Sequence, residues 1–357
     1  MAGQTPSARG RGAGSNPGNR FVPLHLERDA DWDPAEDPAP STVFLQDHSK
    51  SIINYNDSPD IGFDASINPY RGCEHGCVYC YARPTHEYLG FSAGLDFESR
   101  IMVKEAASDL LRKELASPRW KPQVIAMSGV TDCYQPVERR LKITRRCLEV
   151  LAEFRNPVVI VTKNHLVTRD QDVLQELARY QAVGVCISVT SLDSSLASRL
   201  EPRASLPAHR LAAIRTLASA GIPVNVLMAP VIPGLTDHEM PAVLEAARAA
   251  GACSAGYVAL RLPHGVGPLF EDWLKKHYPE RAEKVLGRIR SLRSGHLNDP
   301  RFGSRMRGEG AFADQLEQMF RVASRKAGFA EVRWKLSTAA FRVPSSALEN
   351  RQKIFPF

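Results

Sequence analysis

The 357-residue sequence lacks any apolar run of membrane-spanning length, and its start lacks the charged-then-apolar layout of a signal peptide. It also lacks the cysteine pattern of a disulfide framework, because three of its seven cysteines share one loop and four are scattered. No internal repeat of fixed period is apparent. We therefore expect a cytoplasmic protein with no membrane interaction, in a reducing compartment that suits thiolate ligands.

The composition is that of an ordinary globular protein, with 43% hydrophobic and 24% charged residues. The net charge of +7 favours a polyanionic partner such as nucleic acid. Residues 1–45 are rich in Gly, Pro, Ser and Ala, which predicts a disordered tail. We expect a core domain over residues 46–263 and a helical C-terminal extension over residues 264–357.

From about residue 65, short apolar runs alternate with longer amphipathic ones, which predicts βα units and a parallel sheet. The strands are predicted at 65–68, 124–128, 158–162, 183–189, 224–229 and 257–262. Helices are predicted at 106–115, 139–153, 172–180, 208–220, 242–250, 270–277, 281–292 and 313–327. Most strands are almost continuously apolar, as is typical of strands covered on both faces. Six such units predict an α/β fold, a partial (β/α)6 TIM-like barrel, with the last helices covering its side.

Cys73, Cys77 and Cys80 form a Cys-x3-Cys-x2-Cys run in a loop with glycines at 72 and 76. Three thiolates hold either an iron-sulfur cluster with one iron free of protein, or a zinc ion with a fourth ligand elsewhere. Structural zinc sites usually present two ligand pairs, and no second Cys-x2-Cys follows here. The loop therefore favours an iron-sulfur cluster over zinc, and the lack of a second triad argues against an auxiliary cluster.

Tyr79, the aromatic residue before the third cysteine, makes this run resemble the signature of the radical S-adenosylmethionine (radical SAM) superfamily. Segments at 161–163, 188–191, 200–202 and 229–232 are similar to spore photoproduct lyase and its bacterial relatives. The resemblance implies a 4Fe-4S cluster, S-adenosylmethionine (SAM) and a reductase, or a flavodoxin- or ferredoxin-type electron donor. It also implies reductive cleavage of SAM to methionine and a 5′-deoxyadenosyl radical, which abstracts hydrogen from an unknown substrate.

Polar residues follow the predicted strands at their carboxyl ends, where (β/α) barrels carry functional groups. The resemblance places an ammonium-binding strand end at Ser128, Gly129 and Thr131, although the sequence there is not the common Gly-Gly-Glu form. Lys163 is a point charge suited to the SAM carboxylate. Its alternative is a surface lysine without a function.

Four further residues and the signature aromatic extend this expected SAM site. Ser188 and Thr190 suit the ribose hydroxyls, or are ordinary strand-end residues. The resemblance implies that Tyr79 packs beside the adenine. Glu201 and Arg203 either complete the polar end of the site or form an exposed ion pair, which would contribute little.

One departure separates this sequence from spore photoproduct lyase. That lyase carries a hydrogen-donor cysteine three residues before an Asp, and the matching position here is Gly129, before Asp132. Cys133 follows that Asp and is a candidate thiol donor facing the same cavity. A buried structural cysteine is the alternative. Repair of a DNA photoproduct is therefore a minority hypothesis.

The C-terminal part adds Arg261 and a basic, glycine-punctuated stretch at residues 301–308. This stretch either lines the mouth of the barrel and meets a nucleic-acid or other anionic substrate, or is a solvated loop. A function of another class also stays open, a zinc-stapled nucleic-acid-binding protein without catalysis. Colour would separate the two, because an iron-sulfur protein is brown and a zinc protein is colourless.

Overall fold

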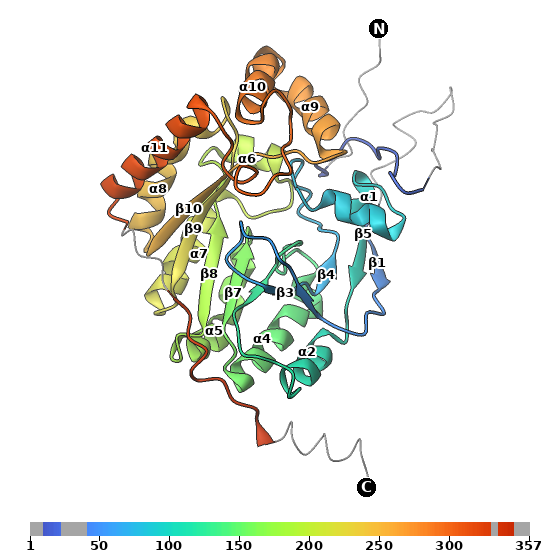
Figure 1. Ribbon diagram of the computed structural model, residues 1–357, viewed down its shortest axis with the longest axis vertical. Coiled ribbons are helices and arrows are strands. Elements are labelled where there is room, and N and C mark those ends of the chain that lie inside the picture. Colours follow the sequence, from blue (N-terminus) through green and yellow to red (C-terminus); the bar gives the residue numbers. More distant parts are fainter. Residues whose placement is uncertain (1–9, 23–40, 330–334, 346–357) are drawn as a thin grey trace.

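The computed structural model describes residues 10–22, 41–329 and 335–345, and its main sheet has seven strands in the order β10-β9-β8-β7-β6-β3-β2 (Figure 1). Neighbouring strands from β3 to β10 are parallel, and β2 pairs with β3 in the antiparallel direction at one edge. The bounds are β2 (Ile53–Tyr55), β3 (Ala65–Ile67), β6 (Ile125–Met127), β7 (Val158–Thr162), β8 (Val183–Ser188), β9 (Val224–Val231) and β10 (Ser254–Ala259). The predicted partial TIM-like barrel is confirmed.

The strand bounds differ from the prediction mainly at the last strand. β10 begins at Ser254 rather than at residue 257, because Ser254 pairs with Asn225 of β9. Ser and Gly residues at this start give no apolar run in the sequence, so only the pairing with β9 places them in the sheet.

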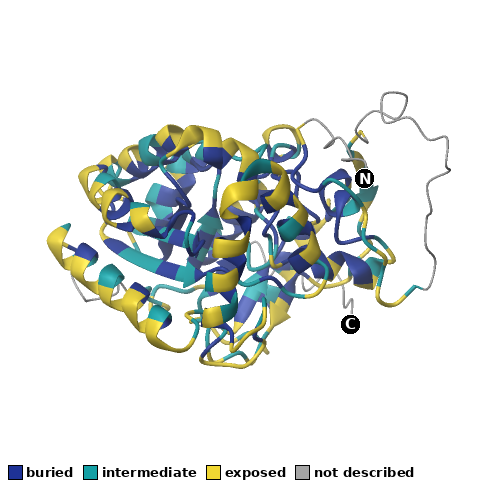
Figure 2. Ribbon diagram, turned by 90° about the horizontal axis from the view of Figure 1, so that it is seen from above, coloured by how far each residue is buried: buried dark blue, intermediate teal, exposed yellow. Residues whose placement is uncertain are grey.

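Helices connect the strands, and their exposed sides face outward around the buried sheet (Figure 2). The predicted helix over 139–153 is two helices, because Lys142 has a φ of 52°, which interrupts the helical backbone. The bounds are α1 (Leu95–Ser99), α2 (Ala107–Leu115), α3 (Glu138–Leu141), α4 (Ile143–Phe154), α5 (Gln171–Ala178), α6 (Ser194–Leu200), α7 (Pro207–Ser219), α8 (Met240–Ala249), α9 (Val266–His277), α10 (Pro279–Leu292) and α11 (Ala311–Lys326). Among the described residues, no helix combines the length and the apolar character needed to cross a membrane.

A second, smaller sheet contains β1 (Val43–Gln46), β5 (Arg100–Val103) and β4 (Tyr70–Arg71), in the order β1-β5-β4. Its first strand starts inside the segment that was predicted to be a disordered tail. That prediction is wrong for residues 10–22 and 43–45, which pack or pair with the rest of the chain. Residues 1–9 and 23–40 of the predicted tail lie outside the described residues.

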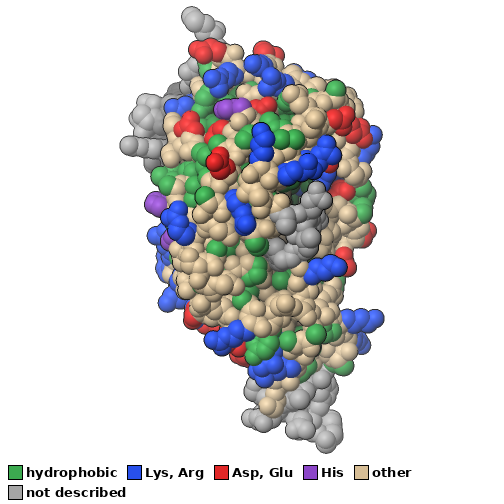
Figure 3. Space-filling view, turned by 90° about the vertical axis from the view of Figure 1, so that its left-hand side faces the viewer, with side chains coloured by type: hydrophobic (Ala, Val, Ile, Leu, Met, Phe, Trp, Pro, Cys, Tyr) green, Lys and Arg blue, Asp and Glu red, His purple; other side chains and the backbone are tan. Residues whose placement is uncertain are grey.

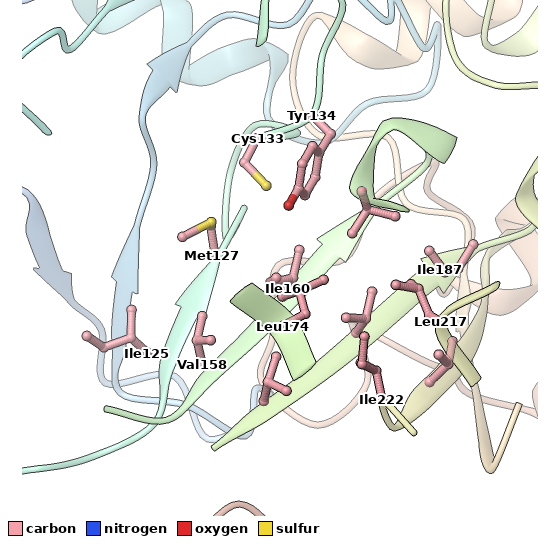
Figure 4. Packing of buried hydrophobic residues seen from close by; sticks show 14 of the residues in the cluster. Ile125, Met127, Cys133, Tyr134, Val158, Ile160, Leu174, Ile187, Leu217 and Ile222 are labelled. Atoms are coloured by element: carbon pink, nitrogen blue, oxygen red, sulfur yellow. The ribbon is translucent and has the colours of Figure 1, made fainter. Parts of the chain in front are cut away.

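Two hydrophobic clusters organise the interior. The larger one fills the space between the main sheet and its helices, for example at Ile125, Ile160 and Leu217 (Figure 4). The second joins Val78 of the cysteine loop to apolar residues of α9 and α10, including Phe270. The helical C-terminal extension therefore packs directly against the loop that carries the cysteines.

The segment between α10 and α11 connects the two edges of the open sheet. On one side, the backbone N–H of Ala259 in β10 donates to the carbonyl oxygen of Met306 at 2.8 Å. On the other side, Asp60, in the turn between β2 and β3, accepts from the Gly303 N–H at 2.7 Å and from Arg305 Nε at 2.6 Å. We call this segment, residues 299–308, the seam loop.

Candidate active site

The cysteine loop leaves the sheet after β3 and β4. It turns at Gly72 and Gly76, whose φ angles of 80° and 66° favour glycine. Cys73 and Cys77 are buried, and Cys80 is half-buried. Burial raises the pKa of all three thiols, and Cys73 lies close enough to the other two for their charges to raise its pKa further. The loop therefore gathers three thiols in one shielded place.

An ion pair between Arg83 and Glu98 supports the loop from behind. Arg83 Nε donates to the carbonyl oxygen of Cys77 at 2.9 Å, and another guanidinium nitrogen donates to that of Gly76 at 3.2 Å. Both members of the pair have 0% exposed side chains. Breaking such a pair leaves a buried charge without a partner, so Arg83 fixes the backbone around the second cysteine firmly.

Residues 10–17, which we call the N-terminal strap, cover the same side of the cysteine loop. The Gly12 and Ala13 N–H groups donate to the two carboxylate oxygens of Glu98 at 3.0 and 2.8 Å. A Cβ atom at Gly12 would lie 1.7 Å from the carbonyl oxygen of Gly76. The two glycines thus let two backbones meet where no side chain fits.

Asp132, at the end of the loop after β6, joins the cysteine loop to the end of β7. Its carboxylate accepts from Thr162 Oγ1 and the Lys163 N–H, both at 2.8 Å, and lies 3.3 Å from His75 Nδ1. Burial by itself would raise the pKa of Asp132, but His75 and the hydrogen bonds from the backbone N–H groups of Lys163 and Tyr134 lower it overall. His75 Nε2 contacts Asn164 Nδ2 at 3.1 Å, so both ring nitrogens of this loop histidine have partners.

Glu201 forms a buried polar cluster with Tyr79, Thr190 and Arg210, which we call the Glu201 cluster. Thr190 Oγ1 donates to Glu201 Oε1 at 2.8 Å, and the Tyr79 hydroxyl donates to the same oxygen. Arg210 pairs with the other carboxylate oxygen, with side chains that are 2% and 0% exposed. The aromatic residue of the cysteine loop is thereby tied to the strand ends on the far side of the site.

Lys163 lies next to this cluster at the end of β7. Its Nζ donates to the carbonyl oxygen of Ala229 at 3.1 Å and lies 6.0 Å from the centre of the Tyr79 ring. Burial alone would raise the pKa of Glu201, but Arg210 and then Lys163 lower it to about 2. The cluster therefore contains a permanent carboxylate between two cations at neutral pH.

Ser188 and Arg203 have different surroundings. The carbonyl oxygen of Ser188, which is buried at the end of β8, accepts from Arg210 Nη1 at 3.0 Å. Arg203 Nη1 lies 3.4 Å from Glu74 Oε1, on the outer side of the cysteine loop. Of the two alternatives for Glu201 and Arg203, the exposed ion pair between them is wrong, because the buried carboxylate of Glu201 pairs with Arg210 instead.

The end of β6 presents backbone as well as side chains. Ser128 has a φ of 75°, and the Gly129 carbonyl oxygen accepts from the Tyr81 hydroxyl at 2.6 Å. The buried Thr131 donates its hydroxyl proton to the carbonyl oxygen of Tyr70 at 2.7 Å. Thr131 thus anchors the start of the cysteine loop. The end of β6 also lies directly beside Tyr81, which follows the third cysteine.

Cys133 lies in the hydrophobic core. Its side chain is 0% exposed and packs among Met127, Tyr134 and Ile160 (Figure 4). Burial raises the pKa of its thiol well above the ordinary value. This burial favours the alternative, a buried structural cysteine, and the role of thiol donor stays a prediction. The backbone N–H of Cys133, which donates to Ser128 Oγ at 2.9 Å, helps to shape the strand end.

Comparison with known proteins identifies the family. Residues 67–247 match the family model of the radical SAM superfamily. The chain is also 36% identical over 262 residues to an uncharacterized protein of Mycobacterium bovis, covering 72% of this chain and 76% of that protein. This chain belongs to the radical SAM superfamily. An uncharacterized protein of Methanocaldococcus jannaschii is 31% identical over 191 residues, which cover 54% of this radical SAM chain and 68% of that protein.

Solved structures of spore photoproduct lyase share the fold of this radical SAM protein. The lyase complexed with dinucleoside spore photoproduct superposes with a TM-score of 0.56 and 16% sequence identity, covering 80% of this chain and 79% of that chain. A variant of the lyase with bound AdoMet and dinucleoside spore photoproduct gives a TM-score of 0.55 and 17% identity. This chain and spore photoproduct lyase therefore share a fold.

Sequence reasoning missed the residues that hold the radical SAM loop in place. Arg83, Glu98 and Asp132 carry no periodic or spacing signal, and the contact of Gly12 with Gly76 joins segments far apart in the chain. Only the position of Asp132 in the segment that follows a predicted strand could have indicated its importance.

Proposed function

We propose that the protein is a radical SAM enzyme in which Cys73, Cys77 and Cys80 hold a 4Fe-4S cluster. The observation that carries this proposal is the hydrogen bonding of Tyr79, in the cysteine loop, to Thr190 after β8 and to Glu201 after α6. In the described residues, no three His, Cys, Asp or Glu side chains are grouped closely enough to hold one metal ion. Three cysteines without a second Cys-x2-Cys pair suit a multi-iron cluster with one iron free of protein better than a structural zinc site.

The bound cofactors would supply the hard chemistry, the reductive cleavage of SAM to methionine and a 5′-deoxyadenosyl radical that abstracts hydrogen from the substrate. The chain would bind and orient SAM. Lys163, with donors left beyond its bond to Ala229, suits the carboxylate, and the backbone at Ser128 and Gly129 suits the ammonium.

The Glu201 cluster would hold the other end of SAM. Thr190 and Ser188, both buried at strand ends, are suited to the ribose, and Tyr79 to the adenine. Glu201 would act by fixing the Tyr79 hydroxyl and Thr190 rather than by pairing with Arg203. Arg203 and Thr131 then serve the cysteine loop, since their hydrogen bonds go to that loop's side chains and backbone.

The proposed electron source is a reductase or a flavodoxin- or ferredoxin-type protein, and the proposed location is the cytoplasm. A nucleic-acid or other anionic substrate is supported by the net charge of +7 and by lyase neighbours whose structures contain a dinucleoside photoproduct. Repair of a DNA photoproduct has less support, because Gly129 stands at the position of the lyase's donor cysteine. The zinc-stapled binding protein has less support, because the three cysteines come without the second ligand pair that a structural zinc site usually presents.

The test is anaerobic purification and cluster reconstitution, then dithionite reduction with SAM and chromatography for 5′-deoxyadenosine. We expect a brown protein that forms this product. Cys77→Ala should abolish product formation, whereas Cys253→Ala, which changes an exposed cysteine outside the loop, should preserve it. A colourless wild-type protein that retains zinc and gives no product would refute the proposal.

A further inference from the structure

Arg261 is a half-buried cation that forms no ion pair and no hydrogen bond with the residues that the structure describes. It follows β10, at the carboxyl edge of the sheet where barrel enzymes bind substrates. Burial lowers its pKa, the sign of a charge held away from water. Since an unpaired, partly buried guanidinium is unfavourable, an anion that supplies its missing partner would bind favourably.

The neighbours of Arg261 place such an anion beside the cysteine loop. The guanidinium lies 4.7 Å from the centre of the Tyr81 ring, and Tyr81 directly follows Cys80. The Tyr81 hydroxyl donates to Gly129 at the end of β6, so the ring is held in place while 45% of the residue stays exposed. A ligand on this arginine would therefore lie next to both the cysteine loop and the proposed SAM site.

The seam loop adds a second pair of an arginine and an aromatic ring. Phe302 is 57% exposed, and the Arg305 guanidinium lies 4.5 Å from its ring centre. Arg305 is fixed by Asp60 across the seam, and it is close enough to Arg261 to lower that residue's pKa. Two exposed rings beside two cations form a surface that stacks bases and neutralises phosphate.

Basic residues elsewhere are distributed differently. On the face formed around α8 and α11, Lys and Arg side chains lie at separate places among acidic ones (Figure 3). Arg215 on α7 is an exposed basic residue that lies far from the seam loop along the chain. General basicity therefore does not account for the arrangement at the seam, where cations and rings alternate.

We propose that Arg261, Tyr81, Phe302 and Arg305 form the substrate-binding surface, and that the substrate is nucleotidyl, with a phosphate on Arg261 and a base on an exposed ring. A bidentate contact from arginine to phosphate fits this role. That this surface binds a nucleotidyl ligand does not depend on the proposed radical SAM function. That the ligand is the substrate of the enzyme does rest on it. Free nucleotides and a single strand of nucleic acid share this chemistry.

The experiment uses the reconstituted full-length protein under anaerobic conditions. A fluorescently labelled oligothymidylate is titrated by anisotropy, and thymidine monophosphate is tested separately by calorimetry. Binding of the oligonucleotide alone supports a strand as the source, and binding of both supports the nucleotide itself. Binding of neither probe overturns the proposal.

Variants test the residues. Arg261→Gln should weaken the affinity for the bound probe by about tenfold or more, and Arg261→Lys should restore part of it. Phe302→Ala, at an exposed position that should not disturb folding, should weaken it about fivefold. The matched control Arg215→Gln removes the same charge and should stay within about twofold. An unchanged affinity in Arg261→Gln, or an equal loss in the control, overturns the proposal.

A second readout separates this inference from the proposed function. 5′-Deoxyadenosine formed by the wild-type protein without substrate is measured separately from probe binding. Wild-type protein that binds the probe but forms no 5′-deoxyadenosine refutes the radical SAM proposal and leaves the binding surface supported.

Discussion

At the residue scale, Glu201 shows how one buried carboxylate can order several side chains. It is 1% exposed and accepts hydrogen bonds from Thr190 and Tyr79 while pairing with Arg210. Without the carboxylate charge, Arg210 would remain as a buried cation without its counter-ion. The cluster therefore contributes to folding as well as to the proposed SAM site.

We predict that Glu201→Gln lowers the free energy of unfolding by about 3 kcal/mol at pH 7. The folded pKa of about 2 lies below the ordinary 4.5, so this stabilisation is fully present above about pH 4.5. It is lost as the pH falls toward 2, and the difference between wild type and variant should shrink over that range. Urea unfolding at a series of pH values measures it.

The control is Glu176→Gln, which removes a carboxylate that forms an exposed ion pair with Arg179 on α5. It should cost less than about 1 kcal/mol, because exposed ion pairs contribute little. A wild-type minus Glu201→Gln difference that does not change with pH would contradict the assignment of the charge to Glu201.

We predict that Cys133→Ala lowers the free energy of unfolding by about 1–2 kcal/mol and leaves 5′-deoxyadenosine formation intact, because its sulfur fills core volume. Cys147→Ala is the matched control, since Cys147 is equally buried in α4. Thermal unfolding and product chromatography give the two readouts. Loss of substrate turnover with unchanged stability would instead restore the role of hydrogen donor to Cys133.

At the scale of elements, the strap shows what composition alone cannot indicate. The glycine-rich, polar residues of the N-terminal strap give no apolar pattern in the sequence. Their Gly12 and Ala13 N–H groups nevertheless donate hydrogen bonds to the buried carboxylate of Glu98. Strands and helices were predicted well because burial on a sheet or on one helix face leaves a period in the sequence. The strap leaves none, since its backbone rather than its side chains makes the contacts.

We predict that Gly12→Ala speeds the loss of iron from the reconstituted protein to a chelator, because the new Cβ would lie 1.7 Å from the Gly76 carbonyl oxygen. The strap or the cysteine loop must then shift. Gly14→Ala, where an added Cβ would meet nothing within 4 Å, is the control and should release iron at the wild-type rate. Equal rates in both variants would show that the strap does not protect the loop.

At the scale of the whole molecule, the seam loop joins the first and last strands of an open sheet. Ala259 of β10 bonds to one part of it and Asp60, after β2, to another. The buried Arg293 strengthens this closure by donating to the carbonyl oxygens of Ser304 and Leu260, both at 2.9 Å. The seam loop thus connects the two edges of the partial barrel.

We predict that Asp60→Asn loosens the seam loop, because it weakens the charged bond to Arg305. Hydrogen exchange of residues 301–308 should rise, and probe affinity at the proposed substrate surface should fall about threefold. Asp57→Asn, at an exposed position in the same turn, is the control. Unchanged exchange in Asp60→Asn would contradict a closing role for this contact.

The sequence by itself determined the barrel strands, their helices and the three-cysteine loop, because each follows from local periodicity or from close spacing along the chain. The tertiary structure alone decided that Glu201 pairs with Arg210, that Cys133 lies in the core, and that the strap covers the cysteine loop. These contacts join distant segments, and their geometry depends on the packing of the whole barrel. The sequence determines the chemical type of each side chain, but the fold determines which partner that side chain contacts.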